Sequence, residues 1–244
     1  MTSLNPLSVP REEAAAAVSG ETIYLFGGQT PAGRTDLVEA YVIEQGTYVQ
    51  CSPMAEKKKD VSLGGIDGRI YVAGGDTGPA WSNRLQVYDP MSDSHKSLAD
   101  MPTRRKDAAG AVVNGRLYVI GGSNKSGYLR CNEVYDPVAD VWSVRRPMPQ
   151  PAASMSATVV DERILLFGGA TAKGHRNDVY AYAPERDQWN RLCLMPIACE
   201  EAVNGVIDRT IYLLGGDAAG RGRLRSIRRF DLSVRPPGNS PTSP

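Results

Sequence analysis

Short apolar stretches alternate with polar turns along the chain, most clearly just before its middle. The small apolar stretch Ala108–Val113 has the length of a strand, and the Asn-Gly pair at 114–115 is a strong signal for a two-residue hairpin turn. Leu117–Ile120 is a continuous apolar run, typical of a strand buried on both faces. Two further strands are predicted around Cys131–Tyr135 and Trp142–Val144. This segment is therefore predicted to form four short antiparallel strands.

The same pattern recurs along the chain with a constant period. Glycine pairs stand 47 residues apart, at Gly27-Gly28, Gly74-Gly75, Gly121-Gly122, Gly168-Gly169 and Gly215-Gly216. A constant period indicates one supersecondary unit copied five times, and each four-stranded sheet must stack on its neighbours to bury both faces. The run Ala14–Ala17 favours a helix in isolation, but its place in the repeat predicts a strand.

Large side chains also recur in register, and we expect them to form the core between sheets. A tyrosine ends the third strand of four repeats, and an aromatic residue or histidine follows seven positions later. A methionine precedes the next repeat. The three sets are Tyr41, Tyr88, Tyr135 and Tyr182; Tyr48, His95, Trp142 and Trp189; and Met54, Met101, Met148 and Met195.

The glycine pair, the Tyr-Asp-Pro and the tryptophan at this spacing resemble the kelch motif. The resemblance implies an all-β, kelch-type β-propeller with five four-stranded blades, one for each repeat. The period and the Pro-Met-Pro between blades look most like the kelch domains of BTB–kelch proteins, which are usually substrate-recognition subunits of cullin-based ubiquitin ligases. The chain differs from that family because it has no BTB or BACK segment and shows five repeats where six are usual.

The two ends of the chain suggest how such a propeller closes. The fifth repeat stops early, and the Pro- and Ser-rich tail 235–244 is expected to be disordered. Residues Thr2–Pro10 align with an outer strand and are predicted to complete the last blade. We therefore expect one kelch domain over residues 1–234. The rival interpretation is a six-bladed propeller that has lost a blade.

Composition and charge exclude several function classes. The chain is 41% hydrophobic with a net charge of +1, shows no apolar run long enough for a membrane span, and shows no secretory signal. Its four cysteines form no motif, which favours free thiols in a reducing compartment. A cytoplasmic, monomeric protein is expected. Five arginines lie in Arg221–Arg229, but this cluster is too local to favour a nucleic-acid-binding function. Protection of an exposed strand edge by charge explains the arginines equally well.

No catalytic constellation is visible. His95 stands at the tryptophan position and is interpreted as a packing substitute, while His175 has no cysteine or carboxylate at ligand spacing. No nucleophile, metal or phosphate-loop motif occurs. We therefore expect no cofactor, no metal and no enzymatic activity.

Two sets of positions remain that packing does not explain. The residue 14 positions before each glycine pair is acidic in four of five repeats, and repeat geometry places this set around the channel mouth. The acidic collar comprises Glu13, Asp60, Asp107 and Glu201, with Ser154 in the fourth repeat. These carboxylates are interpreted either as turn caps or as a negative surface for a basic peptide or cation. Lys59, Lys106 and Arg105 flank the collar and offset part of its charge.

The second set is the loop after each glycine pair, which differs from repeat to repeat on a constant framework, as binding loops do. Aromatic residues and arginines are the usual interface anchors, and the candidates here are Trp81, Arg84, Tyr128, Arg130, Arg34, Arg176, Arg221 and Arg223.

The sequence thus predicts a module that binds a partner protein or peptide on the loop face, as a ubiquitin-ligase substrate receptor or a cytoskeletal binder. The alternatives are a carbohydrate isomerase or mutarotase that uses the collar carboxylates, and a bare or engineered scaffold.

Overall fold

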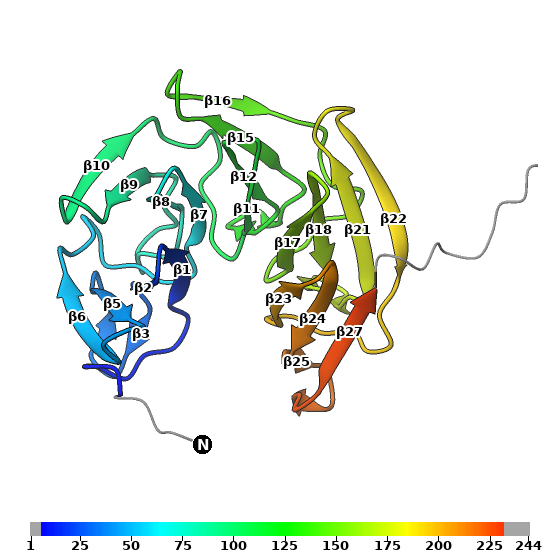
Figure 1. The fold of residues 1–244 in the computed structure, drawn as a ribbon. Helices are drawn as coiled ribbons and strands as arrows, with labels where there is room; N and C mark the ends of the chain where they lie inside the picture. The colour runs from blue at the N-terminus through cyan, green and yellow to red at the C-terminus, as the bar shows by residue number, and fades with distance from the viewer. Residues whose placement is uncertain (1–5, 232–244) are drawn as a thin grey trace, which may run out of the picture. The chain divides into compact units, whose positions relative to one another are not determined.

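A computed structural model describes residues 6–231, and their secondary structure consists entirely of strands. The chain divides into two units, residues 1–154 and 155–244. Figure 1 shows the strands of each unit. No helix with the length and apolar character needed to cross a bilayer occurs among the described residues. The expectation of a single domain over residues 1–234 stays a prediction.

The first unit contains three four-stranded antiparallel sheets. The first sheet is β1 (Ala15–Ser19), β2 (Thr22–Phe26), β5 (Val38–Val42) and β6 (Thr47–Cys51). The second sheet is β7 (Ser62–Ile66), β8 (Arg69–Ala73), β9 (Leu85–Asp89) and β10 (Ser94–Leu98). The third sheet is β11 (Ala109–Val113), β12 (Arg116–Ile120), β15 (Asn132–Asp136) and β16 (Val141–Val144). Short hairpins follow two glycine pairs: β3 (Gln29–Thr30) with β4 (Gly33–Arg34), and β13 (Ser123–Asn124) with β14 (Gly127–Tyr128).

The second unit continues the same topology. The fourth sheet is β17 (Ser156–Val160), β18 (Arg163–Phe167), β21 (Asp178–Ala183) and β22 (Gln188–Leu194). The described part of the fifth sheet is β23 (Val203–Ile207), β24 (Thr210–Leu214) and β27 (Ile227–Asp231). Their short hairpins are β19 (Ala170–Thr171) with β20 (Gly174–His175), and β25 (Asp217–Ala218) with β26 (Gly222–Arg223).

The strands predicted for the third repeat all form, and the alanine-rich run near the N-terminus is strand β1, as its register predicts. The proposed closure of the fifth sheet depends partly on residues 1–5, and the predicted disordered tail comprises residues 235–244. Residues 1–5 and 235–244 lie outside the described residues. Within the first unit, the backbone N–H of Ser8 donates to Glu39 Oε1 at 3.2 Å.

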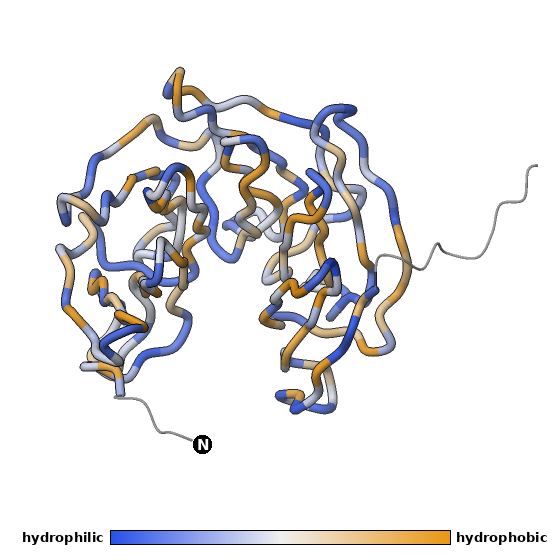
Figure 2. Tube along the Cα trace, in the orientation of Figure 1, coloured by the Kyte–Doolittle hydropathy of each residue, from blue (hydrophilic) through white to orange (hydrophobic). Residues whose placement is uncertain are grey.

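Neighbouring sheets of a unit pack face to face through apolar side chains. In the first unit, Tyr24 and Phe26 contact the ring of Tyr88, with centroids 5.6 and 5.7 Å apart. In the second unit, Phe167 contacts Phe230 with centroids 5.6 Å apart. Hydrophobic stretches follow many of the strands in Figure 2, and hydrophilic ones predominate in many turns. These contacts bury the repeated apolar positions between sheets.

The glycine pairs are required by both backbone conformation and close approach. Gly74 and Gly75 have φ values of +67° and +102°. A Cβ on Gly74 would lie 2.7 Å from the carbonyl oxygen of Arg105, which also accepts the N–H of Gly75 at 3.0 Å. Residues that carry a Cβ rarely adopt such φ values, and the contact with the carbonyl oxygen of Arg105 leaves no room for a Cβ at Gly74. The Gly74-Gly75 pair therefore anchors the second sheet to the segment that enters the third.

The recurring aromatic residues form a second anchor, seen at the outer edge of the third sheet. Tyr135 Oη donates to Asp140 Oδ1 at 2.6 Å, and this carboxylate oxygen accepts the N–H of Ala99 from the preceding sheet at 2.9 Å. Trp142 Nε1 donates to the carbonyl oxygen of Ala99 at 2.7 Å. The two rings pack with centroids 5.2 Å apart.

His95 replaces this tryptophan in the second sheet. Its Nε2 lies 2.9 Å from the carbonyl oxygen of Ser52, the position equivalent to Ala99, and its ring packs on Tyr88. Burial lowers the pKa of His95. The prediction that His95 is a packing substitute is confirmed.

Candidate functional site

The acidic collar residues share an unusual backbone conformation. Glu13, Asp60, Asp107, Ser154 and Glu201 all have φ between 54° and 56°, in the left-handed region. In the first unit they are linked through the main chain. The N–H of Asp60 donates to Glu13 O at 3.2 Å, that of Asp107 to Asp60 O at 3.2 Å, and that of Ser154 to Asp107 O at 2.9 Å. The main chain thus joins successive repeats here, and the side chains remain available for other contacts.

The collar adjoins the loops that follow the glycine pairs. Lys59 and Asp76 exchange backbone hydrogen bonds of 3.1 and 2.8 Å, and Lys106 and Ser123 exchange bonds of 3.1 and 2.9 Å. Within each sheet, therefore, the entry to the inner strand and the variable loop lie at the same end. This is the arrangement that a shared binding surface requires.

Two lysines bridge the carboxylates of the first unit. Lys106 Nζ lies 3.2 Å from Asp107 Oδ2, 3.3 Å from Asp60 Oδ2 and 4.0 Å from Asp76 Oδ2. Lys59 pairs with Glu13 and lies 3.8 Å from Asp60 Oδ2. The lysines therefore offset most of the negative charge that the sequence places here.

Asp60 is the most buried of these carboxylates, with a side chain 7% exposed. Burial, followed by repulsion from the carboxylate of Asp107, raises its pKa to about 7, although Lys106 and Lys59 oppose the shift. Arg34 forms a further ion pair with Asp76 at 3.0 Å. The result is a charge network whose protonation changes near neutral pH.

Beside the collar, loops of the second and third sheets present an aromatic–arginine cluster, which comprises Trp81, Arg104 and Tyr128. Arg104 Nη1 donates to the carbonyl oxygen of Trp81 at 3.5 Å. Its own carbonyl oxygen accepts Asn124 Nδ2 at 3.2 Å, in the hairpin that also carries Tyr128. Trp81 is partly buried, Arg104 is exposed and Tyr128 is 37% exposed.

Sequence reasoning missed Arg104. Its signal is its place three residues before the collar, where the other repeats carry Pro10, Lys57, Pro151 and Ala198. A position that varies this much on a constant framework is typical of a binding surface.

The remaining predicted arginines of the first unit differ in how firmly they are held. Arg130 Nε donates to the carbonyl oxygen of Met148 at 2.5 Å, so this side chain helps to fix the segment between repeats. Arg84 Nε lies 3.2 Å from Glu56 Oε1, but its side chain is 60% exposed. Arg84 is therefore the more accessible of the two.

In the second unit, Arg176 is held inside the fourth sheet, where it pairs with Asp178 and lies over the ring of Tyr180 at 5.7 Å. Arg221 and Arg223 are exposed in the loop that includes β25 and β26. These two side chains thus remain accessible in the predicted loop.

The structure also gives His175 a carboxylate that the sequence spacing did not reveal. His175 Nε2 lies 3.0 Å from Glu200 Oε1, and the N–H of Ala219 donates to His175 Nδ1 at 2.9 Å. Because Nδ1 accepts a hydrogen bond, the ring proton is assigned to Nε2. The histidine thus joins two loops of this unit. Among residues 6–231, no three His, Cys, Asp or Glu side chains gather as a metal-ligand set. All four cysteines are free thiols.

Comparisons with known proteins agree with this architecture. A solved structure titled "Structure of YjhT" superposes with a TM-score of 0.82 at 16% sequence identity, over 93% of this chain and 83% of that one. At that identity the likeness shows the fold alone. The fold class of this chain is therefore a β-propeller, with one blade for each of the five sheets, as predicted.

The family follows from the sequence models. Residues 99–235 match the KLHDC2/KLHL20/DRC7 Kelch-repeats domain, and residues 10–55 and 58–102 match the Kelch motif. The chain belongs to the kelch-repeat family, which confirms the resemblance. Kelch-like protein terF of Aspergillus terreus is 31% identical over 72 residues, which cover 28% of this chain and 16% of that protein's length. Kelch propellers are commonly protein-interaction modules and generally non-enzymatic binding scaffolds.

Proposed function

We propose that this chain binds a partner protein on the loop face of its first unit, with the aromatic–arginine cluster as the anchor. The observation that carries the proposal is the link from Trp81 through Arg104 to the hairpin of Tyr128, which brings an arginine and two aromatic loops together. Tryptophan, tyrosine and arginine provide most of the binding energy in many interfaces. A set of this composition, with Arg104 exposed beside variable loops, is a suitable anchor.

The adjoining collar supports a partner with a basic segment. The side chains of Glu13 and Asp107 are 35% and 21% exposed, so cations of a partner can reach these carboxylates. The basic groups of the partner would then compete with Lys59 and Lys106. Since such exposed pairs are weak and screened by salt, the collar contributes orientation and association rate more than affinity.

The kelch resemblance suggests two partner classes, a substrate of a ubiquitin ligase and a cytoskeletal protein. Affinity capture from lysate with identification by mass spectrometry distinguishes them. We expect specific partners that are lost with Trp81→Ala plus Tyr128→Ala and weakened by Asp60→Ala plus Asp107→Ala.

The matched control is Met91→Ala plus Val138→Ala. These side chains are each 96% exposed at the β9–β10 and β15–β16 turns, away from the loops. Partners retained by the aromatic double variant but lost from the control would refute the proposed surface.

A second candidate, acid–base catalysis on a carbohydrate, is favoured by the pKa of Asp60, which lies near 7. A general acid or base is most effective with a pKa near the working pH. Isomerisation or mutarotation of a sugar panel, followed by polarimetry, tests this candidate. Turnover that Asp60→Asn abolishes, with no captured partner, would replace the binding function by this one.

A further inference from the structure

An arginine–aspartate pair recurs at one end of the second and third sheets. Arg69 Nε lies 3.0 Å from Asp89 Oδ2. In the third sheet, Arg116 Nη2 and Nε donate to Asp136 Oδ2 at 2.9 and 3.1 Å. Each arginine begins the second strand of its sheet, and each aspartate ends the third. The pair therefore occupies the same repeat position in these two sheets.

The same aspartates accept backbone hydrogen bonds from the turn that follows. Asp136 Oδ1 accepts the N–H groups of Val138 and Ala139 at 3.0 and 3.3 Å. These two N–H groups, together with Arg116, lower the pKa of Asp136. The fold thus builds a carboxylate cradle here, with a guanidinium on one oxygen and backbone N–H groups on the other.

The fourth sheet keeps the arginine of this cradle and lacks its carboxylate. The equivalent residues are Arg163 and Ala183, because Tyr-Ala-Pro replaces Tyr-Asp-Pro. The first sheet has neither member, with Thr22 and Val42 at the two positions. Arg163 is exposed, and its side chain makes no ion pair with any other described residue. The fourth sheet therefore contains half of a carboxylate site.

A pocket of about 190 Å³ lies at this place, and both Arg163 and Ala183 line it. Glu185 stands at the position of Val138, whose N–H donates to the aspartate in the third sheet. The N–H of Arg186 donates instead to the carbonyl oxygen of Ala183 at 3.2 Å. The guanidinium of Arg163 and the N–H of Glu185 thus match the donors that hold Asp136.

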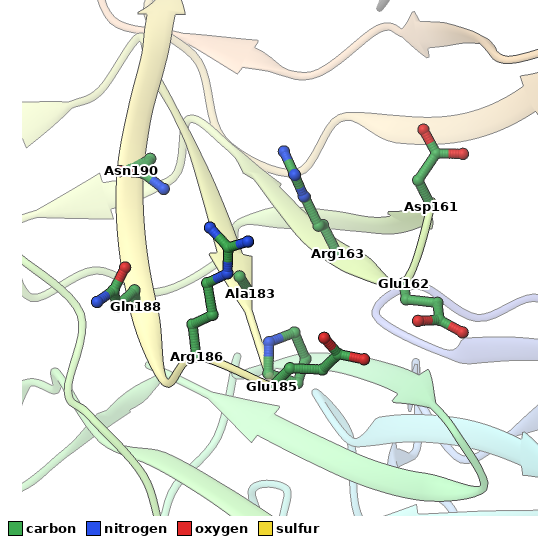
Figure 3. A pocket seen from close by; sticks show the side chains of 9 residues that line it. Asp161, Glu162, Arg163, Ala183, Glu185, Arg186, Gln188 and Asn190 are labelled. Carbon is green, nitrogen blue, oxygen red and sulfur yellow. The ribbon is translucent and has the colours of Figure 1, made fainter.

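The charges around the pocket divide into two sides. Figure 3 shows the guanidinium groups of Arg163 and Arg186 above the carboxylates of Glu162 and Glu185 in that view. Asp161 is already held by Arg209 through two hydrogen bonds. A ligand that bears a carboxylate next to a basic group complements both sides.

We propose that this pocket binds an aspartate or glutamate side chain of a partner peptide, with an adjacent basic residue of the peptide facing Glu162 and Glu185. The ligand carboxylate takes the place that Asp89 and Asp136 occupy in their own sheets. The pocket lies at the end of the fourth sheet opposite the Gly168-Gly169 loop, because Arg163 begins β18 and Gly168 directly follows the end of that strand. This site is independent of the loop-face function proposed above.

Titration of the ¹⁵N-labelled full chain, followed by NMR, tests the proposal with a defined probe. N-acetyl-aspartate N-methylamide should shift the Glu185 amide and the Arg163 Nε resonances with millimolar affinity. The neutral asparagine analogue should bind about tenfold more weakly, since a charge-assisted contact is lost. Extension of the probe to Asp-Lys should increase affinity relative to Asp-Glu.

The decisive variant restores in the fourth sheet the aspartate that the second and third sheets carry. Ala183→Asp places a carboxylate in the cradle, so it should shift the Glu185 amide without ligand and abolish the response to the probe. Arg163→Gln should also abolish it, while Arg225→Gln, a matched change at another exposed arginine of this unit, should not. Equal binding of the aspartate and asparagine probes, or an undiminished response in Ala183→Asp, would overturn the proposal. Tighter binding of N-acetylglycine than of the aspartate probe would assign the pocket to chain termini instead, and would overturn the side-chain assignment.

Discussion

Lys58 is a buried lysine that we expect to destabilise the folded chain at neutral pH. Its side chain is 1% exposed, and its Nζ lies 3.9 Å from Glu56 Oε2. Equivalent positions carry Arg11 and Arg105, each of which pairs with a buried glutamate, whereas the second repeat has the uncharged Gln86 at the glutamate position. Burial lowers the pKa of Lys58 from 10.5 to about 8, although Glu56 opposes the shift.

This pKa shift determines the sign and the size of the effect of Lys58 on the free energy of unfolding. Between pH 8 and 10.5 the unfolded chain binds more protons at this site than the folded chain, so the free energy of unfolding rises with pH across that window. At pH 7 both states are protonated and the folded state carries the full penalty. A difference of about 2.5 pKa units corresponds to about 3 kcal/mol, as an order of magnitude.

Lys58→Met should therefore raise the free energy of unfolding at pH 7 by up to about 3 kcal/mol. The change keeps a side chain of similar length, and the fourth and fifth repeats already carry uncharged residues here, Ala152 and Cys199. Glu56 keeps its contacts with Arg84 at 3.2 Å and with the hydroxyl of Ser82 at 3.1 Å.

Urea denaturation at pH 7 and pH 9.5 measures the effect, with Lys57→Met as the control because Lys57 is exposed one residue earlier. We expect the stability difference between Lys58→Met and the parent chain to shrink at pH 9.5, while Lys57→Met stays within about 0.5 kcal/mol of the parent at both pH values. A Lys58→Met chain that is less stable than the parent at pH 7, with a difference that does not depend on pH, would show that Glu56 compensates the buried charge. The reasoning from burial would then be wrong.

Three further changes test the contacts between repeats. Glu133→Ala should lower the free energy of unfolding by about 3–5 kcal/mol in urea titrations, because it leaves Arg105 buried without its counter-charge; a loss under about 1 kcal/mol would contradict this. His95→Trp should melt within a few degrees of the parent, since an indole N–H can donate to the carbonyl oxygen of Ser52 as in the next repeat; a large loss would show that the imidazole has its own role. Gly74→Ala should cost more than about 2 kcal/mol by the same denaturation assay, since a Cβ would lie 2.7 Å from the carbonyl oxygen of Arg105 and the φ of +67° is strained for alanine; unchanged stability would refute the close approach.

Local signals and the repeat period together predicted the main strands, but not the two-residue hairpins in the loops after the glycine pairs. The Asn-Gly pair at 114–115 and the apolar run before Gly121 specify a hairpin by short-range chemistry, and the constant period transfers that assignment to less clear repeats. The register also predicted that His95 packs like a tryptophan, because position in a repeat determines the neighbours of a side chain.

The candidate site was harder to predict because it depends on the positions in space of the charged groups at the ends of the side chains. The sequence marks Asp60 and Asp107 as acidic and Lys106 as adjacent, but only the structure shows one ammonium group within 4 Å of three carboxylates. The pairing of His175 with Glu200 depends in the same way on two loops that meet in space. Arg163 is a different case, because its missing partner is visible in the aligned repeats once the Arg116–Asp136 pair is known.

The left-handed collar residues have a consequence for how such a chain evolves. In the first unit each repeat is joined to the next by a main-chain hydrogen bond at this position, and the bond needs no particular side chain. A duplicated segment of 47 residues therefore brings its own connection with it. Substitution at the collar then changes the charge of one repeat at a time without altering that connection, and Ser154, the uncharged member of the series, is an example within this chain.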